Sequence, residues 1–237
     1  MAEVGISTPV VDCADLPTRE VNRALRRYAA EGAPRVLVEN PGARHALAVA
    51  LEGTLTIRFA GSVGWYAAGM NQGPHVVVDG NCGWGLGECM TAGRVEVRGH
   101  AGSGTAASIR GGQVFVRGDA GARAGIAMKG GTLIIGGDAG YMSGFMMQRG
   151  TLIICGDAAD GLGDSLYEGV IYVAGRVASL GADAEEHEVT EDDGVLLRRS
   201  LEPYGIDAGS LAFRRVESGR RLWNFSSHEP ELWRSAL

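Results

Sequence analysis

Pairs of apolar residues with one residue between them recur along the chain, and each pair begins at the nineteenth position after the start of the one before. The first pair is Ile57 and Phe59, and the last is Ile171 and Val173. Alternation of this kind over about four residues, with β-branched side chains favoured, is typical of a short strand with one buried face. The pattern therefore predicts a series of equivalent strands. The pairs between the first and the last are Val76/Val78, Val95/Val97, Val114/Val116, Leu133/Ile135 and Leu152/Ile154.

A glycine follows each apolar pair by two residues, and no insertion breaks the interval. These unit glycines are Gly61, Gly80, Gly99, Gly118, Gly137, Gly156 and Gly175. Glycine adopts the positive φ values that tight corners need. Each unit is therefore predicted to be a short strand, a glycine corner and a short connecting segment. We interpret the unit glycines as structural corners.

A fixed period in this range is the signature of a stacked repeat. One unit cannot bury its own apolar face, whereas a stack of units can. With strands about 4.8 Å apart, six steps give an axis of roughly 29 Å. Inward side chains then stack in columns, and the column ten residues after the unit glycines holds Met90, Ile109, Met128, Met147 and Leu166. The sequence predicts an all-β protein, a parallel β-helix of about seven 19-residue rungs.

The segment before the repeats contains a predicted helix from Thr18 to Ala30, with Thr18 as its N-cap. Val21, Leu25 and Tyr28 form its apolar stripe. Because the end units of a solenoid need a cap, we expect this helix to plug the open end of the stack. The first residues, 1–14, show little pattern.

Two apolar segments, 35–39 and 46–51, are predicted to be strands around a turn, and together they form an irregular first rung. We therefore divide the chain into three parts. These are a leader with the capping helix (1–34), the glycine-repeat β-helix (35–183) and an acidic loop with an aromatic C-terminal tail (184–237).

The last part begins with an acidic stretch from Asp183 to Asp193, which is predicted to be a solvated loop. Residues 195–201 are predicted to form a short strand or a turn. From Pro203 onward we expect an irregular tail that either lies back along the β-helix or docks on a partner. Its aromatic residues are Tyr204, Phe213, Trp223, Phe225 and Trp233.

Composition narrows the classes of protein that the chain can belong to. Its 38 glycines are periodic and interleaved with Val, Ile and Leu, which favours an ordered structure. The net charge of −6 argues against a nucleic-acid partner. No apolar run approaches the length of a membrane span, and no secretory signal is visible. We therefore expect a cytoplasmic protein with no nucleic-acid and no membrane partner.

Patterns for catalysis, cofactors and metals are weak. The glycines from Gly80 to Gly87 lack the spacing of a dinucleotide site, and the only lysine, Lys129, is not in a phosphate-binding loop. The five histidines fall in different columns or outside the repeats. The cysteines share no column, which favours free thiols over a metal or iron–sulfur site. They are Cys13, Cys82, Cys89 and Cys155. We expect no catalytic, cofactor-binding or metal-binding residue.

Three carboxylates, Asp119, Asp138 and Asp157, share the column that directly follows the unit glycines. Stacked carboxylates could bind a cation, as in calcium β-rolls, but that motif has a nine-residue period. We predict instead that they accept backbone N–H bonds at the corner, with Arg98 and Arg117 offsetting their charge.

Large apolar residues crowd two parts of the repeat more densely than the inward positions can hold. Neighbours such as Trp65 and Tyr66 cannot both point inward. Exposed aromatic and methionine clusters are typical of protein interfaces. The candidate subunit interface consists of Trp65, Tyr66, Met70, Trp84, Met90, Tyr141, Phe145 and Met146.

The repeat resembles the glycine-repeat (GXGXG) domain at the C-terminus of the glutamate synthase large subunit, over about residues 15–183. The motifs that carry the resemblance are Gly83-Trp84-Gly85-Leu86-Gly87-Glu88, Gly118-Asp119-Ala120-Gly121, Met128-Lys129-Gly130-Gly131 and Gly137-Asp138-Ala139-Gly140-Tyr141-Met142-Ser143-Gly144. The chain looks like a free-standing version of this domain. It most resembles the β-helix subunits of N-methylglutamate synthases (methylamine–glutamate N-methyltransferases), and the β-helix subunit of formylmethanofuran dehydrogenase is a more distant relative.

The resemblance implies a right-handed β-helix and a scaffold role. In the family this domain packs between a class II glutamine-amidotransferase-like unit and a synthase unit that carries FMN and an iron–sulfur cluster. It implies that those units are partner subunits and that this chain holds no cofactor of its own. The residues agree, because an amidotransferase needs a nucleophilic Cys after Met1 and this chain has Ala2 there.

Two classes of function remain open. The first is a non-catalytic scaffold in a complex that converts methylamine and L-glutamate to N-methyl-L-glutamate and ammonia, in an ordinary split glutamate synthase, or in a formylmethanofuran dehydrogenase-like complex. The second is an independent β-helix enzyme or ligand-binding protein. The amine acceptor would bind on another chain, so the sequence does not choose between methylamine and ammonia.

Overall fold

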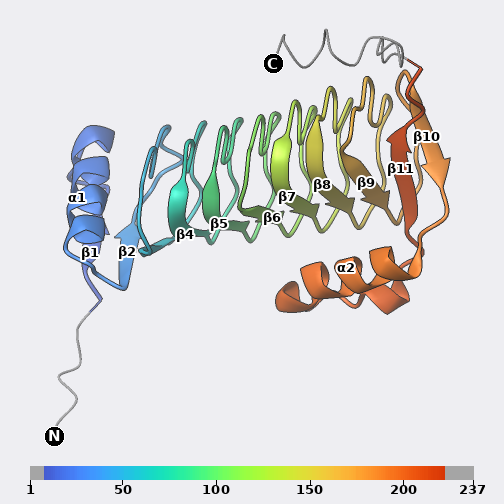
Figure 1. Cartoon of the computed structure of the whole chain (residues 1–237). Coiled ribbons are helices and arrows are strands. Elements are labelled where there is room, and N and C mark those ends of the chain that lie inside the picture. The colour runs from blue at the N-terminus through green and yellow to red at the C-terminus, as the bar shows by residue number, and fades with distance from the viewer. Residues whose placement is uncertain (1–7, 222–237) are drawn as a thin grey trace, which may run out of the picture.

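The computed structural model describes residues 8–221, which form a parallel β-helix of about seven turns (Figure 1). Strands β1 (Val10–Asp12) and β2 (Arg35–Glu39) flank helix α1 (Thr18–Ala30) in the sequence. The repeat supplies β3 (Thr56–Phe59), β4 (Gln72–Val78), β5 (Ala92–Val97), β6 (Gln113–Val116), β7 (Lys129–Ile135), β8 (Arg149–Ile154) and β9 (Val170–Val173). The last part holds β10 (Ala184–His187), α2 (Glu191–Leu201), two 3-10 turns (Glu202–Tyr204 and Ala208–Ser210) and β11 (Arg214–Ser218).

The strands form one sheet along the length of the molecule. From β1 to β9 each strand pairs in parallel with the next, and the register advances by one repeat: Val95 lies beside Val76 on one side and Val114 on the other. Strand β11 then pairs antiparallel with β9, and β10 pairs antiparallel with β11. The parallel β-helix and its repeat strands, predicted from the period of the apolar pairs, are confirmed.

The core is a set of stacked columns inside the rungs. Both residues of every apolar pair are buried, and so is the column ten residues after the unit glycines. Burial of one such Val, Leu, Ile or Met side chain is worth roughly 1.5–3 kcal/mol. The stack therefore supplies the apolar burial that no single rung can provide.

Helix α1 closes the first end of the β-helix, as predicted. Val21 and Leu25 are fully buried against the core. Asn22 completes the seal, because its amide nitrogen donates to the Ala46 carbonyl at 2.7 Å and its amide oxygen accepts from the Ala48 N–H at 2.8 Å. One side chain thus replaces the hydrogen bonds that a preceding rung would make.

Two local predictions near this end are wrong, and one strand was not predicted. Residue Pro17, not Thr18, is the N-cap of α1, and no side chain caps it. The leader contains β1, which pairs with β2. Residues 46–51 form no strand, since Ala46, Ala48 and Ala50 have φ between 52° and 56°. A backbone in which every second residue is left-handed also turns alternate side chains to opposite sides. The segment therefore shows the apolar alternation of a strand although its backbone is not extended.

The predicted acidic loop and the predicted strand or turn over 195–201 are also wrong, because this stretch forms β10 and α2. Thr190 and Asp193 make a reciprocal capping box at the start of α2. Acidic residues are favoured in the first turn of a helix because they face its positive end. The acidic stretch therefore contains the start of a helix.

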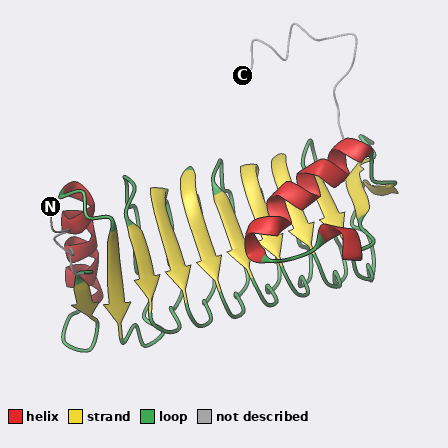
Figure 2. Ribbon diagram, turned by 90° about the horizontal axis from the view of Figure 1, so that it is seen from below, coloured by secondary structure: helices red, strands yellow, loops and turns green. Residues whose placement is uncertain are grey.

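Helix α2 covers the outer face of the sheet (Figure 2). Outward side chains of four successive rungs meet its apolar face in a second, smaller core. The residues of this core include Phe115, Ile134, Ile153, Tyr172, Leu197, Leu201 and Tyr204. Tyr204 stacks on Phe115 with ring centroids 3.7 Å apart, and Phe213 is partly buried beside them. For Tyr204 and Phe213 the tail lies back along the β-helix, whereas Trp223, Phe225 and Trp233 lie outside the described residues.

A buried carboxylate fastens α2 and β11 to the sheet. Asp193 accepts hydrogen bonds from the Tyr172 hydroxyl and the Thr190 backbone, and Arg215 donates to both of its oxygens at 2.9 Å. Burial alone would raise the pKa of Asp193, but these hydrogen bonds together lower it to about 2. These contacts therefore favour the charged form of Asp193 in the folded protein.

We expect Asn22→Ala to lower the free energy of unfolding by about 2 kcal/mol, because it leaves the Ala46 carbonyl and the Ala48 N–H without a partner in a buried site. Urea unfolding followed by circular dichroism measures this loss. Arg23→Ala is the matched control on the same helix, since Arg23 is exposed and pairs only with Glu20. Equal losses in the two variants would contradict the sealing role of Asn22.

The Asp193 contact predicts a pH dependence of stability. Its folded pKa of about 2 lies below the ordinary value of 3.8, so the contribution is complete above pH 4 and is lost as the pH falls toward 2. The difference corresponds to about 2 kcal/mol. Urea unfolding between pH 2 and 7 should show Asp193→Asn less stable than the parent at neutral pH, with the gap closing in acid. Asp192→Asn, on the exposed side of the same turn, should differ from the parent by no more than the roughly 0.3–1 kcal/mol of an exposed first-turn carboxylate.

Candidate partner-binding surface

A ladder of side chains runs along one corner of the β-helix. Each residue that directly follows a unit glycine accepts a hydrogen bond from the backbone N–H of its counterpart in the next rung, at 2.7 to 3.0 Å. The ladder consists of Ser62, Asn81, His100, Asp119, Asp138 and Asp157, and it ends on the N–H of Arg176. The predicted role of the three aspartates as corner acceptors is confirmed.

The predicted charge partners of these aspartates are wrong. Arg98 pairs with Asp79 at 3.0 Å, and Arg117 donates to the Tyr204 carbonyl at 3.2 Å. Each of these arginines directly follows a strand, Arg98 after β5 and Arg117 after β6. The ladder instead meets a charged group of its own column, where Arg176 lies 3.5 Å from Asp157.

The reason for most unit glycines differs from the predicted one. Among them only Gly61 has a positive φ, at 146°. The other six are glycine because a side chain would collide with the preceding rung: a Cβ on Gly156 would lie 2.2 Å from Asp138 Oδ1 and 2.6 Å from the Gly137 carbonyl oxygen. Close approach of rungs, rather than backbone conformation, requires these glycines.

Beyond this corner each rung forms an arc, which we define as residues four to nine after the unit glycine. Every second residue of an arc is left-handed, as in Tyr66, Ala68 and Met70 with φ of 61°, 53° and 54°. Their N–H groups alternate in direction, since Tyr66 and Met70 donate to the next rung and Ala68 donates to the preceding one. The arcs are therefore hydrogen-bonded to each other like strands.

Aromatic rings stack on the first arcs. The rings of His45 and Trp65 are 4.8 Å apart, and those of Trp65 and Trp84 are 5.6 Å apart, all nearly parallel. The glycine column beneath gives them room, because a Cβ on Gly83 would lie 2.5 Å from Trp65 and one on Gly102 would lie 2.5 Å from Trp84. Trp65 and Trp84 are 54% and 61% exposed, so this stack presents flat apolar faces to solvent.

The aromatic column is interrupted after Trp84. The next two positions are Ser103 and Ala122, and the column regains a large ring only at Tyr141. A cavity of about 410 Å³ lies at this break. Its walls are Trp65, Tyr66, Trp84, Gly85, Glu88, Ser103, Gly104, Ala122, Arg123 and Ile126. The lining thus combines small residues, the rings of Trp65, Tyr66 and Trp84, and two opposite charges, Glu88 and Arg123.

The structure brings most of the predicted interface residues to one surface, which we call the arc face. Tyr141, Met70 and Met146 are exposed there, and Tyr66 and Phe145 are half-buried. Met90 is a correction, since it belongs to the inward column and is fully buried. Its place in the repeat is the reason, because Met90 is equivalent to the buried Ile109 and Met128.

Sequence reasoning missed several residues of this surface. His45 precedes the repeats and stacks on Trp65, while its Nδ1 accepts from the Trp65 N–H at 2.9 Å. Glu88, Arg123 and Ile126 line the cavity. The shared column of Trp65 and Trp84, which hold equivalent positions in neighbouring units, was the available signal for the stack. Glu88 and Arg123 could be assigned to this cavity only once the path of the arcs was known.

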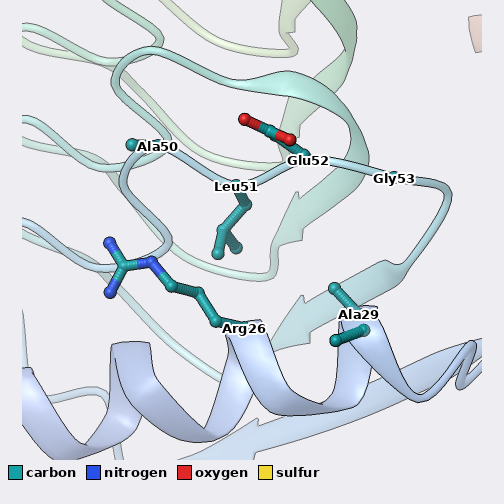
Figure 3. A pocket seen from close by; sticks show the side chains of 7 residues that line it. Arg26, Ala29, Ala50, Leu51, Glu52 and Gly53 are labelled. Atoms are coloured by element: carbon teal, nitrogen blue, oxygen red, sulfur yellow. The ribbon is translucent and has the colours of Figure 1, made fainter.

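A larger cavity, of about 560 Å³, lies between α1 and the first rung (Figure 3). It is lined by Arg26, Ala29, Ala30, Ala50, Leu51, Glu52 and Gly53. Arg26 donates to the Val49 carbonyl at 3.1 Å, which ties the helix to the rung. Three of its seven lining residues are alanine, and Arg26 and Glu52 are its charged residues. We interpret this cavity as the space left where helix α1 meets the first rung of the β-helix.

The thiols and the possible metal ligands of the described part of the chain can be placed one by one. Burial raises the pKa of Cys82 to about 12 and that of Cys155 to about 11, so both thiols are protonated near neutral pH. Within residues 8–221 no group of three or more His, Cys, Asp or Glu side chains is arranged to hold a metal ion. No helix of that part is both long and apolar enough to cross a membrane.

Comparison with known proteins gives one local similarity. No protein-family model matches the chain. The chain is 43% identical over 75 residues to "Protein GlxC" of Rhizobium meliloti (strain 1021). The aligned segment covers 31% of this chain and 32% of that protein, so about a third of each is compared.

Because the rungs approach closely at the corner ladder, adding one methyl group to a unit glycine should strongly destabilise the fold. Gly156→Ala should lower the free energy of unfolding by about 3 kcal/mol, because its Cβ overlaps the preceding rung and displaces the Asp138 carboxylate from the Asp157 N–H. Urea unfolding measures the change. Gly194→Ala is the control, since Gly194 lies in α2, where a Cβ would make only an ordinary contact, at 3.5 Å, with the end of the Arg198 side chain. Alanine there should stabilise the protein by roughly 0.5–1 kcal/mol. A neutral Gly156→Ala would refute close approach as the reason for the glycine.

Proposed function

We propose that this chain is a non-catalytic scaffold subunit of a heteromeric glutamate-synthase-like enzyme in the cytoplasm. The arc face carries the proposal: a row of exposed aromatic and methionine side chains on a backbone that is hydrogen-bonded from rung to rung. Exposed apolar patches of this kind mark protein-interaction sites.

The family-level part of the proposal rests on the glycine repeat and its in-register rungs. The identity of 43% with Protein GlxC over 75 residues supports a relationship to one bacterial protein, over about a third of each chain. The finer assignment is to an N-methylglutamate synthase, with an amidotransferase-like and an FMN- and iron–sulfur-containing subunit as partners. That assignment rests on the sequence resemblance.

The arrangement suggests how a scaffold of this kind works. Helix α2 covers the outer face of β6 to β9, so the arc face on the other side of the stack is open to a second protein. Side chains in equivalent rungs are about 4.8 Å apart and cannot shift independently. A partner that binds Trp65 and Trp84 is therefore held at a fixed position relative to anything bound near Tyr141 and Met146.

Co-expression with the two proposed partner subunits tests this role. We expect an affinity tag on this chain to retain both partners, with the flavin absorbance in the partner and none in this chain. Methylamine with L-glutamate should give N-methyl-L-glutamate with the complete set only. Turnover by this chain alone, or a complex that lacks a flavoprotein, would contradict the proposal. Glutamate formation from 2-oxoglutarate and glutamine, without use of methylamine, would assign the ordinary glutamate synthase instead.

A substitution on the arc face separates the interface from the fold. Trp84→Ala should weaken partner binding by about 30-fold, corresponding to about 2 kcal/mol, because large exposed aromatic residues are frequent binding hot spots. Surface plasmon resonance with each partner subunit measures the loss. Val195→Ala is the control, because Val195 is similarly exposed, at 57%, but lies on α2. Equal affinities for the two variants would place the interface elsewhere.

A further inference from the structure

We propose that segment 222–237 of this chain docks on the arc face and seats Trp233 in the cavity beside Trp84. In this arrangement the protein covers its own exposed aromatic surface. The inference does not rest on the proposed function, because it concerns the free chain and its test contains no partner. A partner that uses the same face would have to displace the segment or bind over it.

The first argument is the concentration of exposed apolar residues on one face. The large exposed hydrophobic residues of the described part include five on the arc face, namely Trp65, Met70, Trp84, Tyr141 and Met146. A patch of this extent on a lone chain is unfavourable in water. The cavity of about 410 Å³ at Trp84 has room for a large side chain and already offers one flat aromatic wall.

The second argument is the point at which the described chain ends. The N–H of Gly219 donates to the Asp183 carbonyl at 2.6 Å, and the N–H of Arg221 donates to the Asp183 carboxylate at 2.9 Å. The preceding carbonyl, of Ala182, accepts from the Ser165 N–H at 2.9 Å. Ser165 is the equivalent of Met146 in the next rung. Residue 221 therefore stands at the end of the arc face.

The path of the last strand agrees with this position. In Figure 1 strand β11 runs from the side where α2 lies to the opposite side of the β-helix, where the loops between strands are. The chain beyond β11 thus starts beside the arcs. It does not need to pass around the sheet or around α2 to reach them.

The third argument is reach. Trp223 and Phe225 are the second and fourth residues after Arg221, and Trp233 is the twelfth. At about 3.4 Å per extended residue these lengths are roughly 7, 14 and 41 Å. Met146 is two rungs from Ala182, or about 10 Å, and the cavity is four to five rungs away, or about 19–24 Å. Phe225 therefore reaches Met146, and Trp233 reaches the cavity with slack.

The fourth argument is the order of charges. Arg123 lies at the near edge of the cavity for a chain that comes from residue 221, and Glu88 lies in a rung farther along. In the segment Glu231 precedes Trp233 and Arg234 follows it. With Trp233 in the cavity, Glu231 meets Arg123 and Arg234 meets Glu88. The opposite chain direction would bring like charges together. Neither Arg123 nor Glu88 makes an ion pair with another residue of the described part.

The four tryptophans of the protein provide the test, because two are on the arc face and two are in the segment. The full-length chain is labelled with 5-fluorotryptophan, and the resonances are assigned by single substitutions. We expect Trp233→Ala to shift the Trp84 resonance and to increase the quenching of Trp84 fluorescence by acrylamide. The aromatic control Trp233→Phe should retain most of the parent position. An unchanged Trp84 resonance in Trp233→Ala would refute the proposal.

Reversing the charges of Arg123 and Glu231 tests the direction in which segment 222–237 lies on the arc face. Arg123→Glu should move the Trp84 resonance toward its position in Trp233→Ala, and Glu231→Lys in the same chain should restore it. Failure of this rescue would reject the proposed chain direction. The parent spectrum should not depend on protein concentration, because the contact lies within one molecule. A shift that appears only at high concentration, with a dimer in light scattering, would assign the face to a second copy and overturn the proposal.

Discussion

Hydrogen bonds between successive rungs are the constraint on which the rest of this structure depends. In the strands and in the arcs, backbone N–H and C=O groups point along the axis of the β-helix and pair with the neighbouring rungs. A buried backbone group without a partner is costly, so every rung has to follow the same path as the one before it. The uniform length of the repeat unit is the consequence, because one extra residue would break the pairing of its rung on both sides.

Stacking of equivalent positions then decides which side chains each column accepts. The inward columns take Val, Ile, Leu and Met, while corners where rungs approach within contact distance take only glycine or alanine. The two ends need other solutions. Asn22 of α1 satisfies the first rung with one amide group, and β11 closes the last rung by antiparallel pairing with β9. The sheet then ends in the short strands β1 and β10, and short edge strands offer few backbone groups for pairing with another chain.

The same stacking explains why the surface, rather than a cleft, is the place to look for function. A narrow stack filled by its own columns leaves little internal volume, and the buried ionisable network of Tyr172, Asp193 and Arg215 fastens α2 and β11 instead of facing a cavity. What varies freely from rung to rung is the outward side of the arcs. The aromatic stack and the break behind Trp84 are built from this variable column, and our proposals for a partner and for segment 222–237 both use it.

The period of the apolar pairs and the unit glycines was sufficient to derive the parallel β-helix, its strands and its inward columns. The helix from Thr18 to Ala30 followed from the helical spacing of Val21, Leu25 and Tyr28, so each of these elements depends on local spacing alone. Local spacing could not distinguish the arc at 46–51 from a strand, since both alternate with a period of two, and it could not show that Asp193 starts a helix. The aromatic and methionine residues of the surface were visible in the sequence, but the burial of Met90 and the stack on His45 follow from the path of the arcs. Only the folded chain brings Glu88, Arg123 and Trp84 around one cavity, because they belong to different rungs and meet through stacking.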